Sequence, residues 1–334
     1  MKKILLVISF LILTQSIFAQ VDIFDENDTT KMDCSQKSFD LGFRNTGISF
    51  GNSPVWNGLR FNISDCGVEQ INGINITFWK PGRNPASKIN GISIGAAPFA
   101  YEMKGISIGV AAVMGLDKLQ GINIGGLAAI SEGTIDGINI GGLAVVAQKK
   151  LRGINIGGLA TVSEGDQFGI NIGGLAVVAK NNLFGFNFGG LATVSEGNMF
   201  GVNFGGLAVV SKESLKGINL AGLAVVGEES ILGISTALLA VVGNSEIKGF
   251  TIAGYKIETP DFRGFNVSGW MDVGDFRGFS AAVYNKVANS QRGLVIGLFN
   301  VADELHGVQI GLINIAKNNK GIAKVLPFIN ANFD

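Results

Sequence analysis

Histidine, cysteine and proline are scarce in this chain of 334 residues, which contains one histidine, two cysteines and six prolines. One histidine and two cysteines are too few for a His-rich or Cys-rich metal site. A Ser/His/Asp or Cys/His set would have to use His306, which we expect instead to be a residue at the end of a strand. We therefore predict no catalysis and no bound metal or cofactor.

Net charge is also lacking, because 26 basic residues balance 26 acidic ones. A neutral chain has no general electrostatic attraction for a polyanion, so we expect no nucleic-acid partner. After the first 19 residues, no apolar run approaches the ~20 residues that a membrane helix needs. Any crossing of a membrane would have to use strands.

The beginning of the chain differs from the rest. Two lysines precede an apolar run from Ile4 to Leu13, and the small residue Ala19 follows. This pattern predicts a cleavable signal peptide over residues 1–19, so we expect the mature chain to leave the cytoplasm. In an oxidising compartment Cys34 and Cys66 can form a disulfide. The alternative is two buried thiols in an irregular N-terminal region.

Glycine is abundant, with 49 residues, and it recurs at a fixed period. From Gly121 to Gly249 a glycine opens each sixteen-residue phrase of the type Gly-Ile-Asn-Ile-Gly-Gly-Leu-Ala-Val-Val, which ends in a polar turn. Short stretches of alternating apolar residues bounded by Gly, Asn and Ser predict strands, and the period is typical of a repeat protein. We expect a polar extension over residues 20–57 and one repeat domain over residues 58–334.

The turns alternate between two chemistries. Ser-Glu-Gly turns contain Glu132, Glu164 and Glu196, and the turns between them are basic or amide-rich, as at Lys149 and Lys180. The full period is therefore thirty-two residues. A hairpin explains this period if successive turns lie at opposite ends of an antiparallel meander.

These features predict an all-β fold, namely an antiparallel, up-and-down transmembrane β-barrel of about 18 strands. Rows of Ile, Phe and Val would face lipid, and rows of Asn and Gly would line a tight interior. Tyrosine and tryptophan number only three each, which is few for two aromatic girdles, and uncharged phrases suit a wide aqueous lumen poorly. We predict an outer-membrane barrel of structural or narrow-channel type, with outer-membrane lipid as its partner.

The alternative fold is a β-solenoid with one repeat per coil. Each phrase would form two short strands that meet at the Gly-Gly pair, with Asn139 outward. The side chains expected to face inward are Ile138, Ile140, Leu143 and Val145. Such a chain would be a secreted or surface-exposed scaffold for binding or adhesion. It would leave the alternation of the turns unexplained, because all its turns lie on one side.

One asparagine recurs at the same position of seven successive phrases. We expect these amides to form a structural hydrogen-bonded ladder, with the lining of a lumen or binding site as the alternative. The ladder comprises Asn123, Asn139, Asn155, Asn171, Asn187, Asn203 and Asn219.

The charged turns allow two further interpretations. The recurring glutamates could bind a cation as an acidic row. The basic residues could instead contact lipid phosphate; they are Lys149, Lys150, Arg152, Lys180 and Lys212. In both cases we favour the simpler interpretation, in which these charged residues are solvated and keep the turns soluble.

The closing phrases are Gly293-Leu-Val-Ile-Gly-Leu-Phe-Asn-Val-Ala and Gly307-Val-Gln-Ile-Gly-Leu-Ile-Asn-Ile-Ala, and Leu326-Pro-Phe-Ile-Asn-Ala-Asn-Phe follows them. From about Gly58 onward the chain resembles a family of bacterial surface-repeat proteins, which carry tandem Gly-x-x-Ile-Gly-Leu-x-Asn phrases after a signal peptide. The resemblance implies an outer-membrane or cell-surface location and no particular activity. The penultimate residue, Phe333, is similar to the insertion signal of outer-membrane barrels, although Asp334 follows it.

Overall fold

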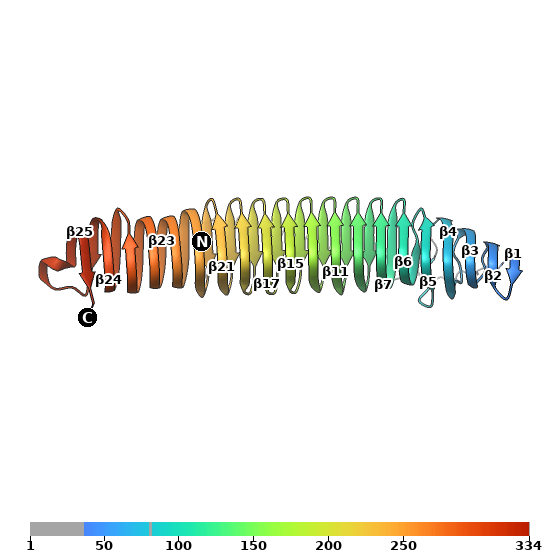
Figure 1. Cartoon of the computed structure of the whole chain (residues 1–334), viewed down its shortest axis with the longest axis horizontal. Coiled ribbons are helices and arrows are strands. Elements are labelled where there is room, and N and C mark those ends of the chain that lie inside the picture. The colour runs from blue at the N-terminus through green and yellow to red at the C-terminus, as the bar shows by residue number, and fades with distance from the viewer. Residues whose placement is uncertain (1–36, 80–81, 334) are drawn as a thin grey trace. The chain divides into compact units, whose positions relative to one another are not determined.

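The computed structural model describes residues 37–79 and 82–333, and within these ranges the chain is a β-solenoid. Successive phrases form successive coils, which are stacked side by side along one axis (Figure 1). A typical coil contains one long strand, such as β9 (Thr134–Gly141), and one short strand, such as β10 (Ala144–Ala147). Corners of two or three residues join the strands of the central coils.

The first strands are β1 (Ser38–Phe43), β2 (Thr46–Gly51), β3 (Val55–Ser64), β4 (Gln70–Trp79), β5 (Lys88–Gly95), β6 (Phe99–Gly109) and β7 (Ala112–Gly125). The other long strands of the central coils are β11 (Lys150–Gly157), β13 (Asp166–Gly173), β15 (Leu183–Gly189), β17 (Met199–Gly205), β19 (Leu215–Ala221) and β21 (Ser230–Ala237). The other short strands are β8 (Ala128–Ser131), β12 (Ala160–Ser163), β14 (Ala176–Ala179), β16 (Ala192–Ser195), β18 (Ala208–Ser211), β20 (Ala224–Gly227) and β22 (Ala240–Gly243). The C-terminal elements are β23 (Glu246–Ile296), β24 (Phe299–Ala316), the 3-10 helix η1 (Gly321–Lys324) and β25 (Val325–Asn332).

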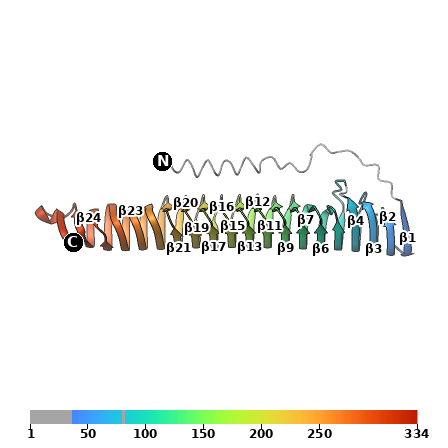
Figure 2. The ribbon, with the colours of Figure 1, turned by 90° about the horizontal axis from the view of Figure 1, so that it is seen from above.

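In the central coils, the strands of neighbouring coils pair in parallel and without a shift in register. Gly153 of β11 lies opposite both Gly137 of β9 and Gly169 of β13. The short strands stack in the same way and follow one side of the coils (Figure 2). In the part of the chain that the structure describes, antiparallel pairs occur only at the ends, between β1 and β2 and between β24 and β25. The expected antiparallel barrel is therefore wrong, and the chain has the alternative solenoid fold.

The stack begins at Ser38, inside the segment expected to be a polar extension. The predicted signal peptide over residues 1–19 lies outside the described residues, so it stays a prediction.

An apolar core lies between the long and the short strand of each coil. In one coil Ile135 of β9 packs inside with Val145 and Ala147 of β10, and all three are fully buried. In the coil of Thr161 and Gln167 a polar contact takes the place of this apolar one. There, buried Gln167 donates a hydrogen bond from Nε2 to Oγ1 of buried Thr161, 3.1 Å away.

The glycine that opens each phrase sets how closely neighbouring coils approach. Gly169 has a φ of +107°, and a Cβ at this position would lie 2.2 Å from the carbonyl oxygen of Gly153 in the preceding coil. Glycine tolerates positive φ because it has no Cβ. At this position the same property also makes room for the backbone of the next coil.

We expect Gly169→Ala to lower the free energy of unfolding by about 1–3 kcal/mol, because alanine is strained at this φ and its Cβ overlaps a carbonyl. The measurement is the midpoint of urea unfolding followed by circular dichroism. Lys180→Ala, at an exposed position, is the control and should change stability by no more than about 0.5 kcal/mol. Equal midpoints for the two variants would contradict this role of the glycine.

Candidate functional site

Apolar side chains cover the outside of the coils around one corner. In the coil opened by Gly137, Ile138 and Ile140 point outward from β9, and Leu143 occupies the corner before β10. We call this corner the apolar corner. Half-buried Ala144 follows it on β10. The rows formed by these four outward positions in successive coils are called the apolar strip below.

The apolar strip runs through eight consecutive coils, and its only polar outward position is Thr236, which takes the place of Ile140 in the eighth coil. Its corner row consists of Leu127, Leu143, Leu159, Leu175, Leu191, Leu207, Leu223 and Leu239, all at least 37% exposed. The row of Ile138 consists of Ile122, Ile138, Ile154, Ile170, Phe186, Val202, Ile218 and Ile234. Stacked rings occur in the row of Ile140, where Phe188 and Phe204 have centroids 4.8 Å apart. The row of Ile138 extends beyond these coils in both directions, to exposed Ile74 and Phe250.

The direction of these side chains corrects the expectation for a solenoid. Asn139 was expected outward but is fully buried, whereas Ile138 was expected inward but is 39% exposed. Leu143 at the corner is also exposed, and only Val145 faces inward as expected. The cause is the alternation of a strand, which places Ile135 inside and therefore Asn139, four residues later, on the same side. The coil thus has a polar inner row beneath an apolar outer surface.

The asparagines of successive coils form a buried ladder. In each of the six steps from Asn123 to Asn219 the side-chain Nδ2 donates a hydrogen bond to Oδ1 of the next asparagine, at 2.8 Å. Asn219 ends the ladder by donating to Oγ of Ser235 at 3.3 Å. At the other end, Oδ1 of Asn123 has no partner among the described residues. Each internal asparagine side chain therefore accepts one hydrogen bond from the preceding coil and donates one to the next coil.

The backbone at the apolar corner is also paired from coil to coil. The N–H of Gly142 donates to the carbonyl of Gly125 at 3.1 Å, and the N–H groups of Leu143 and Ala144 both donate to the carbonyl of Leu127, at 2.6 and 3.1 Å. The same pattern repeats in the following coils. The apolar strip consequently exposes side chains without exposing unpaired N–H groups at its corner.

Charged residues gather at the opposite corner, where each short strand leads into the next long strand. We call the corner at Gln148 and Lys149, with its equivalents, the charged edge. Lys180 Nζ lies 3.0 Å from Oε1 of Glu164 in the preceding coil, and Lys212 Nζ lies 3.1 Å from Oε2 of Glu196. Alternating signs on stacked corners thus explain the thirty-two-residue period.

The sequence analysis expected successive turns at opposite ends of an antiparallel meander, and this expectation is wrong. Glu132, Lys149 and Glu164 all lie on the charged edge, and each of them forms an ion pair. Glu132 pairs with Arg83 at 2.8 Å, and Lys149 pairs with Asp117 at 3.4 Å. Because a lysine lies between Glu164 and Glu196, these glutamates form no continuous acidic row. The remaining basic residues are paired as well, Lys150 with Asp166 at 3.9 Å and Arg152 with Asp136 at 2.6 Å.

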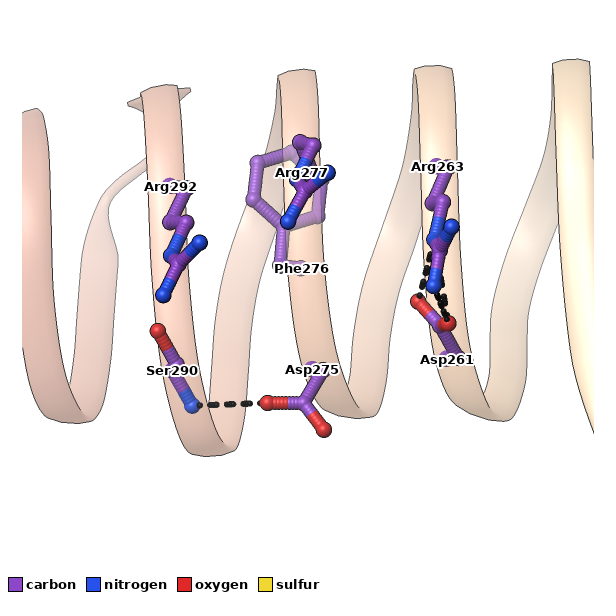
Figure 3. A pocket seen from close by; sticks show the side chains of 7 residues that line it. All are labelled: Asp261, Arg263, Asp275, Phe276, Arg277, Ser290 and Arg292. Carbon is purple, nitrogen blue, oxygen red and sulfur yellow. Dashed lines mark hydrogen bonds and ion pairs between the residues drawn. The ribbon is translucent and has the colours of Figure 1, made fainter.

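The sequence analysis did not single out a row of arginines on the C-terminal coils. Arg263, Arg277 and Arg292 each directly precede an opening glycine, a signal that the sequence already contained. Figure 3 shows their guanidinium groups on neighbouring coils, where they line a cleft of about 170 Å³. Arg263 donates to Asp261 Oδ2 at 2.6 Å, and this hydrogen bond raises the pKa of the guanidinium. Asp275 also lines the cleft, so the two carboxylates of Asp261 and Asp275 offset most of the positive charge of the three arginines.

A buried ion pair near the N-terminus was also absent from the sequence analysis. Arg60 is fully buried and forms an ion pair with Asp65. Its Nη1 also donates to Oδ1 of Asn75 at 2.8 Å, and Thr77 donates to Oδ2 of Asp65 at 2.7 Å. A buried charge needs such partners to offset its lost hydration. This network therefore serves the packing of the first coils.

The remaining predicted residues lie apart from the apolar strip. His306 lies within β24 and not at the end of a strand as expected, with its Nε2 3.7 Å from Glu304 Oε2. Phe333 is 79% exposed. Within residues 37–79 and 82–333 no three His, Cys, Asp or Glu residues are grouped to hold a metal. Cys66 is not a free thiol. Cys34 lies outside the described residues, so its pairing with Cys66 stays a prediction.

Comparisons with protein families, with curated proteins and with solved structures find no match to this chain. No helix in the described part of the chain has both the length and the apolarity needed to span a bilayer. The surfaces of the solenoid are therefore the features that bear on function.

Asn171→Ala should lower the free energy of unfolding by about 2–5 kcal/mol, because it leaves Nδ2 of Asn155 and Oδ1 of Asn187 buried without partners. Asn123→Ala, at the end of the ladder, orphans only Oδ1 of Asn139 and should cost about 1–3 kcal/mol. Urea unfolding of both variants tests the difference. An internal variant as stable as the terminal one would show that the second orphaned group carries no cost.

Lys180→Glu places three carboxylates in a row with Glu164 and Glu196. We expect a loss of about 0.5–1 kcal/mol relative to Lys180→Gln, which removes the ion pair without adding like charge. Added salt should reduce the difference, because these groups are exposed and screened. Unfolding at low and high ionic strength measures it. A difference that does not respond to salt would exclude charge repulsion as its cause.

Proposed function

We propose that the chain is an exported, surface-associated β-solenoid that acts as a non-catalytic binding scaffold. The apolar strip is the observation that carries this proposal. With coils about 4.8 Å apart, its eight leucines alone extend roughly 35 Å. Monomeric soluble proteins rarely expose a contiguous apolar patch larger than a few hundred Å², and larger patches mark interaction sites. The strip is therefore interpreted as the surface that engages a partner.

The two corners of each coil support a division of roles. The charged edge carries the ion pairs, including those of Lys180 and Lys212, and keeps one side of the solenoid in water. The apolar corner carries leucines such as Leu175, which is 46% exposed. A partner on the strip would remove these leucines from water, at roughly 25 cal/mol per Å² of apolar surface. The charged edge would remain accessible.

Two sequence features support the proposed location of this scaffold at a cell surface. The predicted signal peptide supports export, and the resemblance to bacterial surface-repeat proteins supports a location on the outer membrane. Neither feature supports chemistry. The one histidine, His306, lies 3.7 Å from Glu304, and the scaffold proposal includes no reaction.

The function predicts that the apolar strip retains the protein on the cell envelope. In a Gram-negative host that exports the full chain, replacement of Leu159, Leu175 and Leu191 by glutamate should shift the protein from the envelope to the soluble fraction by roughly tenfold or more. The matched control replaces Lys149, Lys180 and Lys212 by glutamine and should stay with the envelope.

Circular dichroism of both triple variants establishes that they retain strand structure. If the folded leucine variant stays in the envelope as well as the control does, the strip is not the binding surface and the proposed function is wrong.

A further inference from the structure

We propose that the partner of the apolar strip is the acyl chains of a phospholipid bilayer, in which the strip is seated within one leaflet. This inference rests on the proposed function and names its partner. The shape of the strip, its backbone pairing, its height and the position of the charges favour this partner.

The apolar surface continues around a corner instead of lying on one plane. Ile138 and Ile140 point outward from the long strand, Leu143 occupies the corner, and Ala144 begins the short strand. The two strands meet closely there, because a Cβ on Gly141 would lie 1.9 Å from the carbonyl oxygen of Ala144. The strip is thus the outside of a thin apolar wedge.

A wedge distinguishes between two kinds of partner. The flat face of a second copy can cover the long-strand side or the short-strand side, but it cannot cover both together with the leucine row. Acyl chains are fluid and surround all of these surfaces at once. The leucines at the tip, including Leu143 and Leu159 at 47% exposure each, would enter the apolar phase first.

Hydrocarbon accepts backbone only where its polar groups are already paired. Within the wedge, Leu159 N–H donates to the carbonyl of Leu143 at 2.7 Å, and Leu175 N–H donates to that of Leu159 at 2.7 Å. Parallel pairing of β9 with β11 satisfies the long strands in the same way. In the first seven coils of the strip, the polar side chains of this region belong to the asparagine ladder, which is buried inside the coils. In the eighth coil Thr236 adds one half-buried hydroxyl to the row of Ile140. Seating the first seven coils of the wedge in lipid therefore adds no unpaired polar group from these elements.

The height of the wedge agrees with one leaflet. From Ile138 to the corner at Gly142 the strand rises about 13 Å at 3.3 Å per residue, and half of a bilayer's hydrocarbon core is about 15 Å. Charges begin just beyond this height, at Asp136 and Arg152, which pair with each other at 2.6 Å. These charges would lie at the level of the headgroups. The neutral strip itself requires no anionic lipid.

Vesicle binding with the purified full chain tests this inference. The probe is a vesicle of phosphatidylcholine, with and without bromine on the acyl chains, which quenches tryptophan fluorescence on contact. Leu175→Trp places the reporter on the wedge. Lys180→Trp places it on the charged edge, at the next corner along the chain. The unsubstituted chain supplies the background of its native tryptophans.

We expect binding that survives high salt and added fluorescence from Leu175→Trp that is quenched at least twofold more by brominated than by ordinary lipid. The added fluorescence from Lys180→Trp should be unaffected. The triple glutamate variant of Leu159, Leu175 and Leu191 should bind vesicles roughly a hundredfold more weakly.

Equal quenching at the two positions, or the absence of vesicle binding, would overturn the lipid partner. If the folded triple variant still left the envelope in that case, the scaffold function would stand with a protein as its partner. Sedimentation of the chain without lipid adds a second criterion. A stable dimer that dissociates in the triple variant, together with the absence of vesicle binding, would assign the strip to a second copy.

Discussion

The stacking of each residue on its equivalent in the next coil is the constraint on which this structure depends. It requires the close backbone approach at glycines such as Gly169, where a Cβ would meet a carbonyl oxygen at 2.2 Å. Once this approach is fixed, whatever one coil places at a position is repeated along the stack. A favourable contact between neighbouring coils is then repeated along the stack, as are the hydrogen bonds of the asparagine ladder. An unfavourable exposure is repeated in the same way, as are the exposed leucines of the apolar corner.

The polarity of the coil follows from this repetition. A single buried asparagine would need partners that a short apolar strand does not offer, but a column of them supplies each amide with a neighbour on both sides. Asn139 is therefore compatible with the interior, although the sequence analysis placed it outside. Since a strand alternates its faces, accepting the asparagine inside requires Ile138 and Ile140 to be outside. The surface is apolar because the interior is partly polar.

The sequence predicted strands, the repeat and the location of charge in the turns, because these depend on local composition and period. The barrel that the sequence analysis predicted was wrong. A straight strand that faces lipid and a strand on one side of a solenoid coil show the same two-residue alternation, so the sequence pattern does not distinguish them. The alternating turns were explained from the sequence only by opposite ends of hairpins, whereas stacked coils allow a second explanation, opposite charges on one edge. The pairing of Lys180 with Glu164 selects the second. The same sequence held the arginines that precede Gly264, Gly278 and Gly293, but only stacking brings them together in one cleft.

The charge pattern of the edge has a consequence for how such a chain can change its length. Loss or gain of one coil would bring glutamates such as Glu164 and Glu196 onto adjacent corners, where they repel. Loss or gain of two coils would restore the pairing of lysine with glutamate. Duplications in this region should therefore be tolerated in units of thirty-two residues more readily than in units of sixteen, although the backbone would accept either.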